Sequence, residues 1–162
     1  MKDLILMRHA KSAWGNASLG DHARPLNKRG QRAATALGHW LRTEDLVPDQ
    51  ILCSTSVRTI ETCDRLDLGR PPDLLDSLYL AEPAGMLGAL RRAKGTCVLM
   101  IGHNPGICDL AHALVSDPPA HDRFGDYPTG ATLVARFDVA DWADIAPGTA
   151  TVLHFITPHD LT

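Results

Sequence analysis

Three short apolar runs in this chain each lead directly into a polar segment. The runs cover residues 4–7, 51–53 and 98–101. A short run without polar interruption is typical of a strand that is buried on both faces in a parallel sheet. Open α/β sheets bind their ligands at the carboxyl ends of such strands. We therefore expect the three polar segments to meet at one edge of a sheet.

Apolar residues also recur at helical spacing between these runs. Asn27 stands at an N-cap position, before a helix whose predicted inner face is Ala33, Ala34, Leu37, Trp40 and Leu41. A second helix is predicted over residues 55–66, with Val57, Ile60 and Cys63 facing inward, and a third over residues 84–92.

The best-defined helix follows the third apolar run. Asn104 is predicted as its N-cap and Pro105 as its first residue, and apolar side chains continue at i, i+3 and i+4 spacing to residue 115. Further strands are predicted at residues 74–75, 132–137 and 151–156. Polar loops are predicted over residues 14–25 and 116–127.

The alternation of strands and helices predicts an α/β fold. We expect a three-layer, doubly wound and mostly parallel sheet with helices on both faces, finished by a strand pair that includes an antiparallel edge. With 162 residues, the chain has the length of one domain, residues 1–162. Only 23 residues separate Arg58 from Glu82 and 20 separate Glu82 from His103, which leaves no room for a lid.

Composition narrows the class of partner. A net charge of -3 and an aromatic content of 5% argue against a nucleic-acid partner and an anionic membrane surface. The apolar runs are far shorter than the roughly 20 residues of a membrane span, and the N-terminus has no signal-peptide layout, so we expect a cytoplasmic protein. The four cysteines form no C-x-x-C pair and are expected to be reduced.

The polar segments carry residues that suit phosphoryl transfer. Such a site needs fixed cations around the phosphoryl oxygens and a nucleophile in line with the phosphorus. Arg8 and Arg58 can each donate two parallel hydrogen bonds to an oxyanion. A neutral histidine can attack phosphorus and later leave it, so His9 is the candidate nucleophile. His103 is the candidate donor to the phosphoryl oxygens.

No metal site is expected. The other six histidines show no H-E-x-x-H or similar ligand spacing, and we assign them structural or solvated positions.

Several motifs together resemble those of a known family, the histidine phosphatase superfamily. Its Arg-His-Gly signature is similar to Arg8-His9-Ala10, and the continuation resembles the SixA-type phosphohistidine phosphatase branch. The matching segments are Arg8-His9-Ala10-Lys11-Ser12-x-Trp14, Asp21-His22-x-Arg24-Pro25-Leu26-Asn27-x-Arg29-Gly30, Ser54-x-x-x-Arg58-Thr59-x-x-Thr62, Leu78-Tyr79-Leu80-Ala81, Gly102-His103-Asn104-Pro105-Gly106 and Thr157-Pro158. They extend over nearly the whole chain.

The resemblance implies a phosphoglycerate mutase-like fold and assigns roles to these residues. His9 would be the phosphorylated nucleophile, and Arg8, Arg58 and His103 would form the phosphate pocket, with no metal or organic cofactor. Gly15 stands where mutase-like members place an asparagine, which argues against mutase activity.

Other positions have two interpretations or a secondary role. Glu82 is either the general acid or a solvated acid in the first turn of a helix. Arg24 either touches the substrate or braces the loop. Ser12 and Asn104 are additional candidates for phosphate contact.

The substrate class follows from the expected open pocket. An open phosphate pocket can admit a phosphorylated side chain on another protein, so phosphohistidine on a signalling protein of the histidine phosphotransfer type is the leading hypothesis. A phosphatase of small phosphorylated metabolites is the alternative enzyme. The alternative from another class is a catalytically idle module that binds phosphorylated partners.

Overall fold

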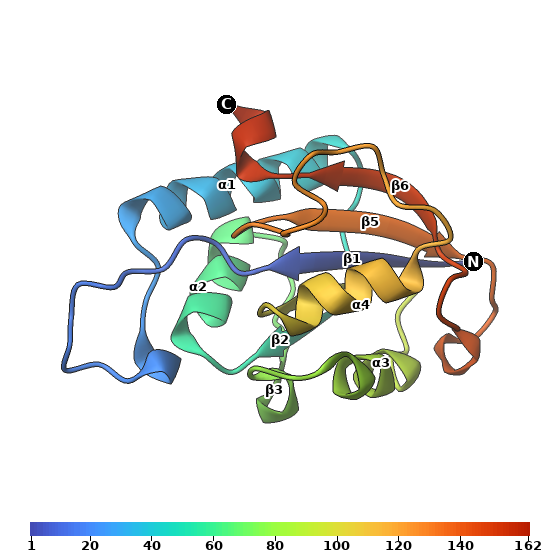
Figure 1. Ribbon diagram of the computed structural model, residues 1–162, viewed down its shortest axis with the longest axis horizontal. Helices are drawn as coiled ribbons and strands as arrows, with labels where there is room; N and C mark the ends of the chain where they lie inside the picture. Colours follow the sequence, from blue (N-terminus) through green and yellow to red (C-terminus); the bar gives the residue numbers. More distant parts are fainter.

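The computed structural model describes residues 1–162 as a six-stranded sheet with two helices on each face (Figure 1). The strands are β1 (Lys2–Arg8), β2 (Gln50–Ser54), β3 (Asp73–Leu75), β4 (Cys97–Gly102), β5 (Thr132–Phe137) and β6 (Thr151–Ile156). The helices are α1 (Lys28–Thr43), α2 (Val57–Leu66), α3 (Pro83–Arg91) and α4 (Gly106–Leu114). Short 3-10 turns lie at Asp21–Ala23, Asp76–Leu78, Trp142–Asp144 and Pro158–Leu161.

The sheet has the order β3-β2-β4-β1-β5-β6. Its first four strands pair in parallel, whereas β5 pairs antiparallel with β1 and β6 antiparallel with β5. The predicted doubly wound, mostly parallel α/β class is confirmed, and the chain has no lid domain. The antiparallel strand, β5, lies one place inside the sheet because β6 flanks it.

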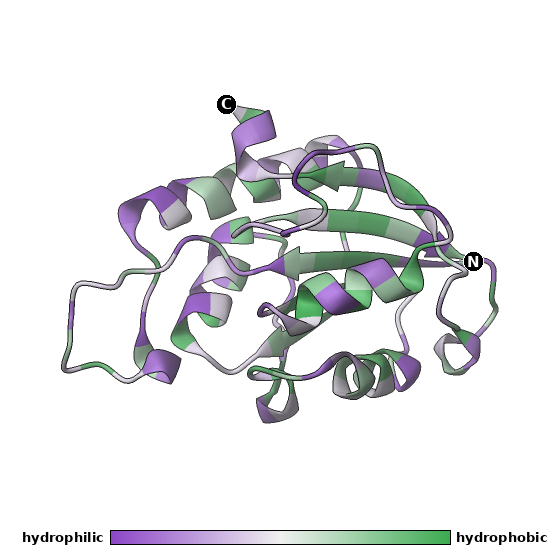
Figure 2. Cartoon of the chain, in the orientation of Figure 1, coloured by the Kyte–Doolittle hydropathy of each residue, from purple (hydrophilic) through white to green (hydrophobic).

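Alternation along the strands divides the core into two layers. Leu4 and Leu6 of β1 pack in the cluster under α3 and α4, whereas Ile5 and Met7 pack in the cluster under α1 and α2. Successive side chains of a strand point to opposite faces, so a strand covered on both faces must be apolar throughout. In Figure 2 the strands are largely green, whereas the helices carry green and purple residues side by side. None of the helices has the length and apolar character that crossing a membrane requires.

The predicted helix start is confirmed for α1 and is wrong for α4. Asn27 is the N-cap of α1, and its side chain accepts a hydrogen bond from the Gly30 amide at 2.8 Å. The predicted cap of α4 was wrong by one position, because Pro105 is the N-cap and the helix begins at Gly106. The Asn104 side chain accepts from the Cys108 amide at 3.3 Å and donates to the carbonyl of Tyr127 at 2.9 Å, and so ties α4 to the loop before β5.

The predicted inward face of α2 is confirmed at Cys63 and is wrong at Val57 and Ile60. Val57 and Ile60 are only half-buried, and the buried residues are Arg58, Thr59, Thr62, Cys63 and Leu66. The first two turns of this helix face a polar interior, so an apolar pattern could not identify the buried side. All four cysteines are free thiols, two of them buried and two half-buried.

Candidate active site

The carboxyl ends of β1, β2 and β4 lie side by side at one edge of the sheet, where the arrowhead of β1 ends in Figure 1. Arg8 of β1 is in register with Gly102 of β4, so His9 and His103 follow neighbouring strands directly. Ser54 closes β2, and Arg58 lies in the first turn of α2. The structure thus brings together the four residues that the sequence singled out.

His9 is almost fully buried, with 5% of its surface exposed, and its ring is held in one tautomer. Its Nδ1 lies 2.7 Å from the carbonyl oxygen of Ala10. Because a carbonyl oxygen only accepts hydrogen bonds, Nδ1 carries the proton and Nε2 keeps its lone pair. The Nε of Arg58 donates to this Nε2 at 3.3 Å. The nucleophilic nitrogen therefore faces a guanidinium.

The surroundings of His9 keep the ring neutral. Burial, followed by the charges of His103, Arg58 and Arg8, lowers the pKa of His9 from 6.5 to about 3. The ring is unprotonated at neutral pH, as attack on phosphorus requires.

Arg58 is 2% exposed and connects most of the site. Besides its bond to His9, its Nη2 donates to Nδ1 of His103 at 3.2 Å and to the carboxylate of Asp21 at 3.0 Å. Its Nη1 donates to the Asp21 carbonyl at 2.7 Å. The planar guanidinium thus fixes two histidines and one loop at once.

Arg8 is the second guanidinium of the site. Its Nη1 donates to the carbonyl of Tyr127 at 3.2 Å, but its Nε is buried without a hydrogen-bond partner. Burial, and then the charge of Arg58, lowers the pKa of Arg8. A buried donor without a partner costs about 1–3 kcal/mol, so the unpartnered Nε of Arg8, beside the guanidinium of Arg58, favours a bound oxyanion.

His103 is 2% exposed and packs against His9, with 5.3 Å between the ring centroids. Burial, and then the nearby Arg58 charge, lowers its pKa to about 4. Its Nε2 lies 2.8 Å from the hydroxyl of Ser54. Because Nδ1 accepts from Arg58, Nε2 carries the proton and donates to the Ser54 hydroxyl, which could also donate to Nε2 if the tautomer changed.

Asp21 is a site residue that the sequence reasoning missed. Its carboxylate accepts hydrogen bonds from the Tyr79 hydroxyl, from Arg58 and from Arg24. These three bonds, with that of Tyr79 first, hold the pKa of Asp21 well below its usual range. The available signal was the placement of Asp21 three residues before Arg24 in the matched Asp-x-x-Arg-Pro segment. Tyr79 lies in the segment Leu78-Tyr79-Leu80-Ala81, which is a weak motif when taken alone.

The four predicted residues line a pocket of about 300 Å³ together with Ser12, Asp21, Arg24 and Asn104. Arg24 donates to the Ser12 hydroxyl at 2.7 Å and to the Ala13 carbonyl at 3.2 Å. Its guanidinium also stacks 3.6 Å above the ring of Trp14. These contacts brace the loop, and the pocket-facing position of Arg24 keeps a substrate contact within its reach.

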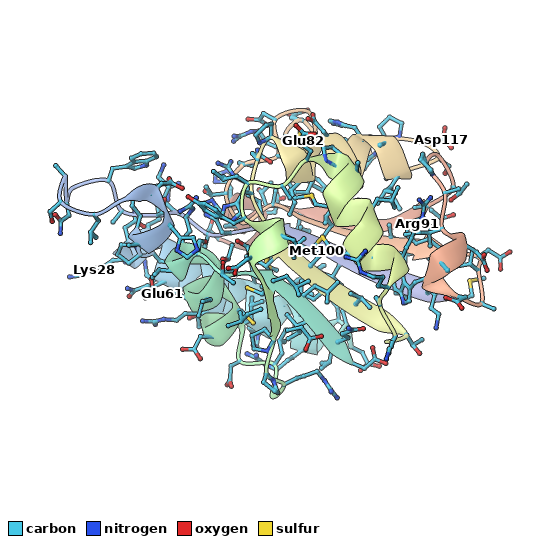
Figure 3. All side chains as sticks on the ribbon, turned by 90° about the horizontal axis from the view of Figure 1, so that it is seen from below. Lys28, Glu61, Glu82, Arg91, Met100 and Asp117 are labelled. Atoms are coloured by element: carbon cyan, nitrogen blue, oxygen red, sulfur yellow. The ribbon has the colours of Figure 1, made fainter.

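Glu82 lies outside this pocket. It is exposed at the N-cap of α3, where its side chain makes no capping hydrogen bond (Figure 3). Asp21 is the only carboxylate in the pocket lining. No group of three or more histidine, cysteine, aspartate or glutamate side chains is arranged to hold a metal ion.

Comparison with known proteins gives a consistent result. Residues 4–79 match the family model of the histidine phosphatase superfamily (branch 1). An uncharacterised protein of Mycobacterium tuberculosis is 35% identical over 159 residues, which cover 94% of this chain and 99% of that protein.

Two solved structures share the fold over nearly their full length. A chain assigned as the phosphohistidine phosphatase SixA of Nakamurella multipartitia is 30% identical with a TM-score of 0.86, covering 97% of this chain and 96% of that one. The protein histidine phosphatase SixA complexed with tungstate is 22% identical with a TM-score of 0.76, covering 99% of both chains. The similarity therefore includes every strand end and helix that forms the pocket.

Proposed function

We propose that this phosphatase, which belongs to the histidine phosphatase superfamily and to its SixA-type branch, dephosphorylates phosphohistidine on a protein through a phosphorylated His9. The observation that carries the proposal is the unprotonated Nε2 of His9, which lies 3.3 Å from the Nε of Arg58 in a pocket with two guanidiniums. The nucleophile and the groups that bind phosphoryl oxygens thus occupy one small space.

In the first half-reaction, Nε2 of His9 attacks the phosphorus of the substrate phosphohistidine. The new bond joins Nε2 to phosphorus, while the old phosphorus–nitrogen bond breaks and its electron pair stays on the substrate imidazole, which leaves neutral because its other ring nitrogen already carries a proton. Arg8 and Arg58 bind the equatorial oxygens, where the charge of the transition state is spread. When a phosphoryl oxygen replaces Nδ1 of His103 as the acceptor of Arg58, His103 donates to the phosphoryl group from Nδ1 and its Nε2 accepts from Ser54.

In the second half-reaction, water attacks the phosphorus on His9. A new phosphorus–oxygen bond forms, and the electron pair of the phosphorus–nitrogen bond returns to Nε2. Both protons of the water stay on phosphate oxygens, so the product leaves as dihydrogen phosphate, and the Ala10 carbonyl keeps the proton of His9 on Nδ1 throughout.

The lack of a protonated carboxylic acid in the pocket supports phosphohistidine over alkyl phosphate esters. An alkoxide leaving group needs an acid, because its conjugate acid is nearly as weak as water, at about 15.7. Imidazole has a pKa of about 6.5 and leaves neutral once it carries a proton. The single carboxylate of the pocket, Asp21, is held ionised by its partners and so is a poor acid.

A side-by-side assay tests the proposal. Purified protein is given a phosphohistidine-bearing phosphotransfer domain, a phosphotyrosine peptide and sugar phosphates, each with and without EDTA. We expect kcat/KM to be about a hundredfold or more higher on phosphohistidine than on sugar phosphates, which is the lower end of what a general acid supplies. The rate should be unchanged by EDTA, blocked by vanadate and absent in His9→Ala.

Two results would count against it. A preference for sugar phosphates would favour the metabolite phosphatase. If EDTA abolished the activity and a divalent metal restored it, the reaction would require a metal ion in addition to the two arginines.

A further inference from the structure

A second pocket, of about 360 Å³, adjoins the phosphate pocket and shares Arg8 and Lys11 with it. We call it the cationic pocket and define it by four side chains, Arg8, Lys11, Arg29 and Arg123. It lies between the end of β1, the start of α1 and the loop that leads into β5. Any group bound there is next to a phosphoryl group on His9.

Most of the positive charge in the cationic pocket is not neutralised. Arg123 pairs with Asp126 at 2.9 Å, and this is the only ion pair within the pocket. Lys11 and Arg29 take part in none of the ion pairs of the structure. Together with Arg8, they leave three cations without a carboxylate partner.

Local structure opposes this placement of charge. Arg29 follows Lys28 (labelled in Figure 3) in the first turn of α1, which contains no acidic residue. The helix dipole disfavours cations at this end. The backbone of Lys11 is fixed beside the same turn, because its carbonyl accepts from the Asn27 amide at 3.0 Å. Residues whose charge is unfavourable for the local structure, with no stabilising contact to offset it, are expected at functional sites.

The mouth of the phosphate pocket also carries exposed apolar side chains. Trp14 is 72% exposed and Leu80 is 55% exposed, and both line the pocket. Leu80 has a positive φ of 51°, a conformation that a leucine rarely adopts. Large apolar groups held in solvent beside a binding pocket are typical of a protein-binding surface. They favour a macromolecular substrate over a small metabolite.

We propose that the cationic pocket is a subsite for an acidic side chain next to the phosphorylated residue of a protein substrate. This inference rests on the proposed function and specifies its substrate class. The acidic group would pair with Arg29 and Lys11 while the phosphoryl group occupies the neighbouring phosphate pocket.

Two synthetic peptides that differ at one place test this subsite. Both carry phosphohistidine, flanked by glutamate in one and by glutamine in the other, and kcat/KM is measured for each. Binding of the same pair with a non-hydrolysable phosphohistidine analogue is measured by titration. We expect wild type to prefer the acidic peptide about fivefold at low salt, as for one charge pair in water, with the preference shrinking at high salt.

Arg29→Glu is the test variant and Arg32→Glu its matched control. Both arginines are exposed on α1, but Arg32 lies outside the cationic pocket. We expect Arg29→Glu to abolish or reverse the preference and Arg32→Glu to keep it. A glutamate in the first helical turn suits the dipole, so Arg29→Glu should melt no lower than wild type.

The possible failures separate the two proposals. The subsite would be overturned if wild type showed the same kcat/KM and the same affinity for both peptides. It would also be overturned if Arg29→Glu and Arg32→Glu preferred the acidic peptide equally. Either result would leave phosphohistidine hydrolysis intact. The subsite would also be overturned by a second pattern of results. In that pattern wild type prefers a sugar bisphosphate over a sugar monophosphate, and Arg29→Glu removes this preference without changing kcat/KM on the peptides. Absence of hydrolysis of either peptide would contradict the proposed function, and the titration would still test Arg29.

Discussion

The guanidinium of Arg58 is the hydrogen-bonding centre of the site. It contacts His9, His103 and Asp21 at the same time. A lysine keeps the charge but offers one ammonium on a flexible stem and cannot make the three contacts together. We expect Arg58→Lys to lower kcat/KM by about a hundredfold or more.

Arg65→Lys on the same helix is the matched control for this change. Arg65 is exposed and bonds to Gln31 at 3.1 Å, away from the pocket. Its replacement should leave kcat/KM unchanged. An Arg58→Lys variant within threefold of wild type would show that charge alone is sufficient and that the fork geometry is not used.

Replacing Glu82 distinguishes the hydrolysis of phosphate esters from the hydrolysis of phosphohistidine, which is a phosphoramidate. Because its side chain lies outside the pocket and imidazole is a good leaving group, Glu82→Gln should keep phosphohistidine hydrolysis within a few-fold of wild type. Any activity on alkyl esters should fall further. Kinetics on both substrates check this, and a loss of roughly a hundredfold on phosphohistidine would make Glu82 the general acid.

At the scale of the elements, the phosphate loop depends on a close approach to α1. A Cβ added at Gly30, the third residue of α1, would lie 2.0 Å from the carbonyl oxygen of Lys11. Backbone atoms cannot yield as a flexible side chain does. We expect Gly30→Ala to lower the free energy of unfolding by about 1–3 kcal/mol and to reduce activity, because the segment with Lys11 and Ser12 must shift.

Gly85→Ala offers a matched control, since Gly85 is the third residue of α3. Nothing lies within 4 Å of a Cβ added there. This change should raise the free energy of unfolding by about 0.4–1 kcal/mol, because alanine restricts the unfolded chain. Urea denaturation of both variants measures the contrast. Equal effects at the two positions would contradict the account of Gly30.

The elements differ in how well the sequence predicted them. The ranges 132–137 and 151–156 match β5 and β6, because both segments are rich in the β-branched and aromatic residues that favour strands. Most of the inward face of α2 was missed because Arg58, Thr59 and Thr62 are polar residues whose buried side chains are held by hydrogen bonds. Thr62, for example, accepts from the Ala10 amide at 3.1 Å and so supports the backbone beside His9.

At the scale of the molecule, the sheet topology explains which site residues were predictable. Arg8, His9 and His103 follow strand ends directly, and parallel strands bring such ends together. Asp21 and Tyr79 belong to separate loops and meet only after the chain has folded. Their contact depends on loop conformation, for which the sequence contained no periodic pattern.

The buried histidines also couple stability to pH. The pKa values of His9 and His103 are about 3 and about 4 in the folded protein, against an ordinary 6.5. Below pH 6.5 the unfolded chain therefore binds more protons than the folded one, so stability falls as the pH falls toward 4 and is unaffected by these groups above 6.5.

His9→Gln removes one of these two groups. Between pH 7 and pH 5 the variant should lose less unfolding free energy than wild type by about 1–2 kcal/mol, measured by urea denaturation at both pH values. An equal loss in the two proteins would mean that His9 is not held neutral by the fold.

The central claim, that His9 is the nucleophile, is tested most directly by trapping the intermediate. Brief exposure to a labelled substrate followed by rapid denaturation should leave phosphate on the protein in a bond that is stable in base and lost in acid, as expected for a phosphorus–nitrogen bond. Peptide mapping should place the label on His9, and His9→Ala should retain none. Label that survives acid, or that maps to a serine, a cysteine or another histidine, would contradict the account.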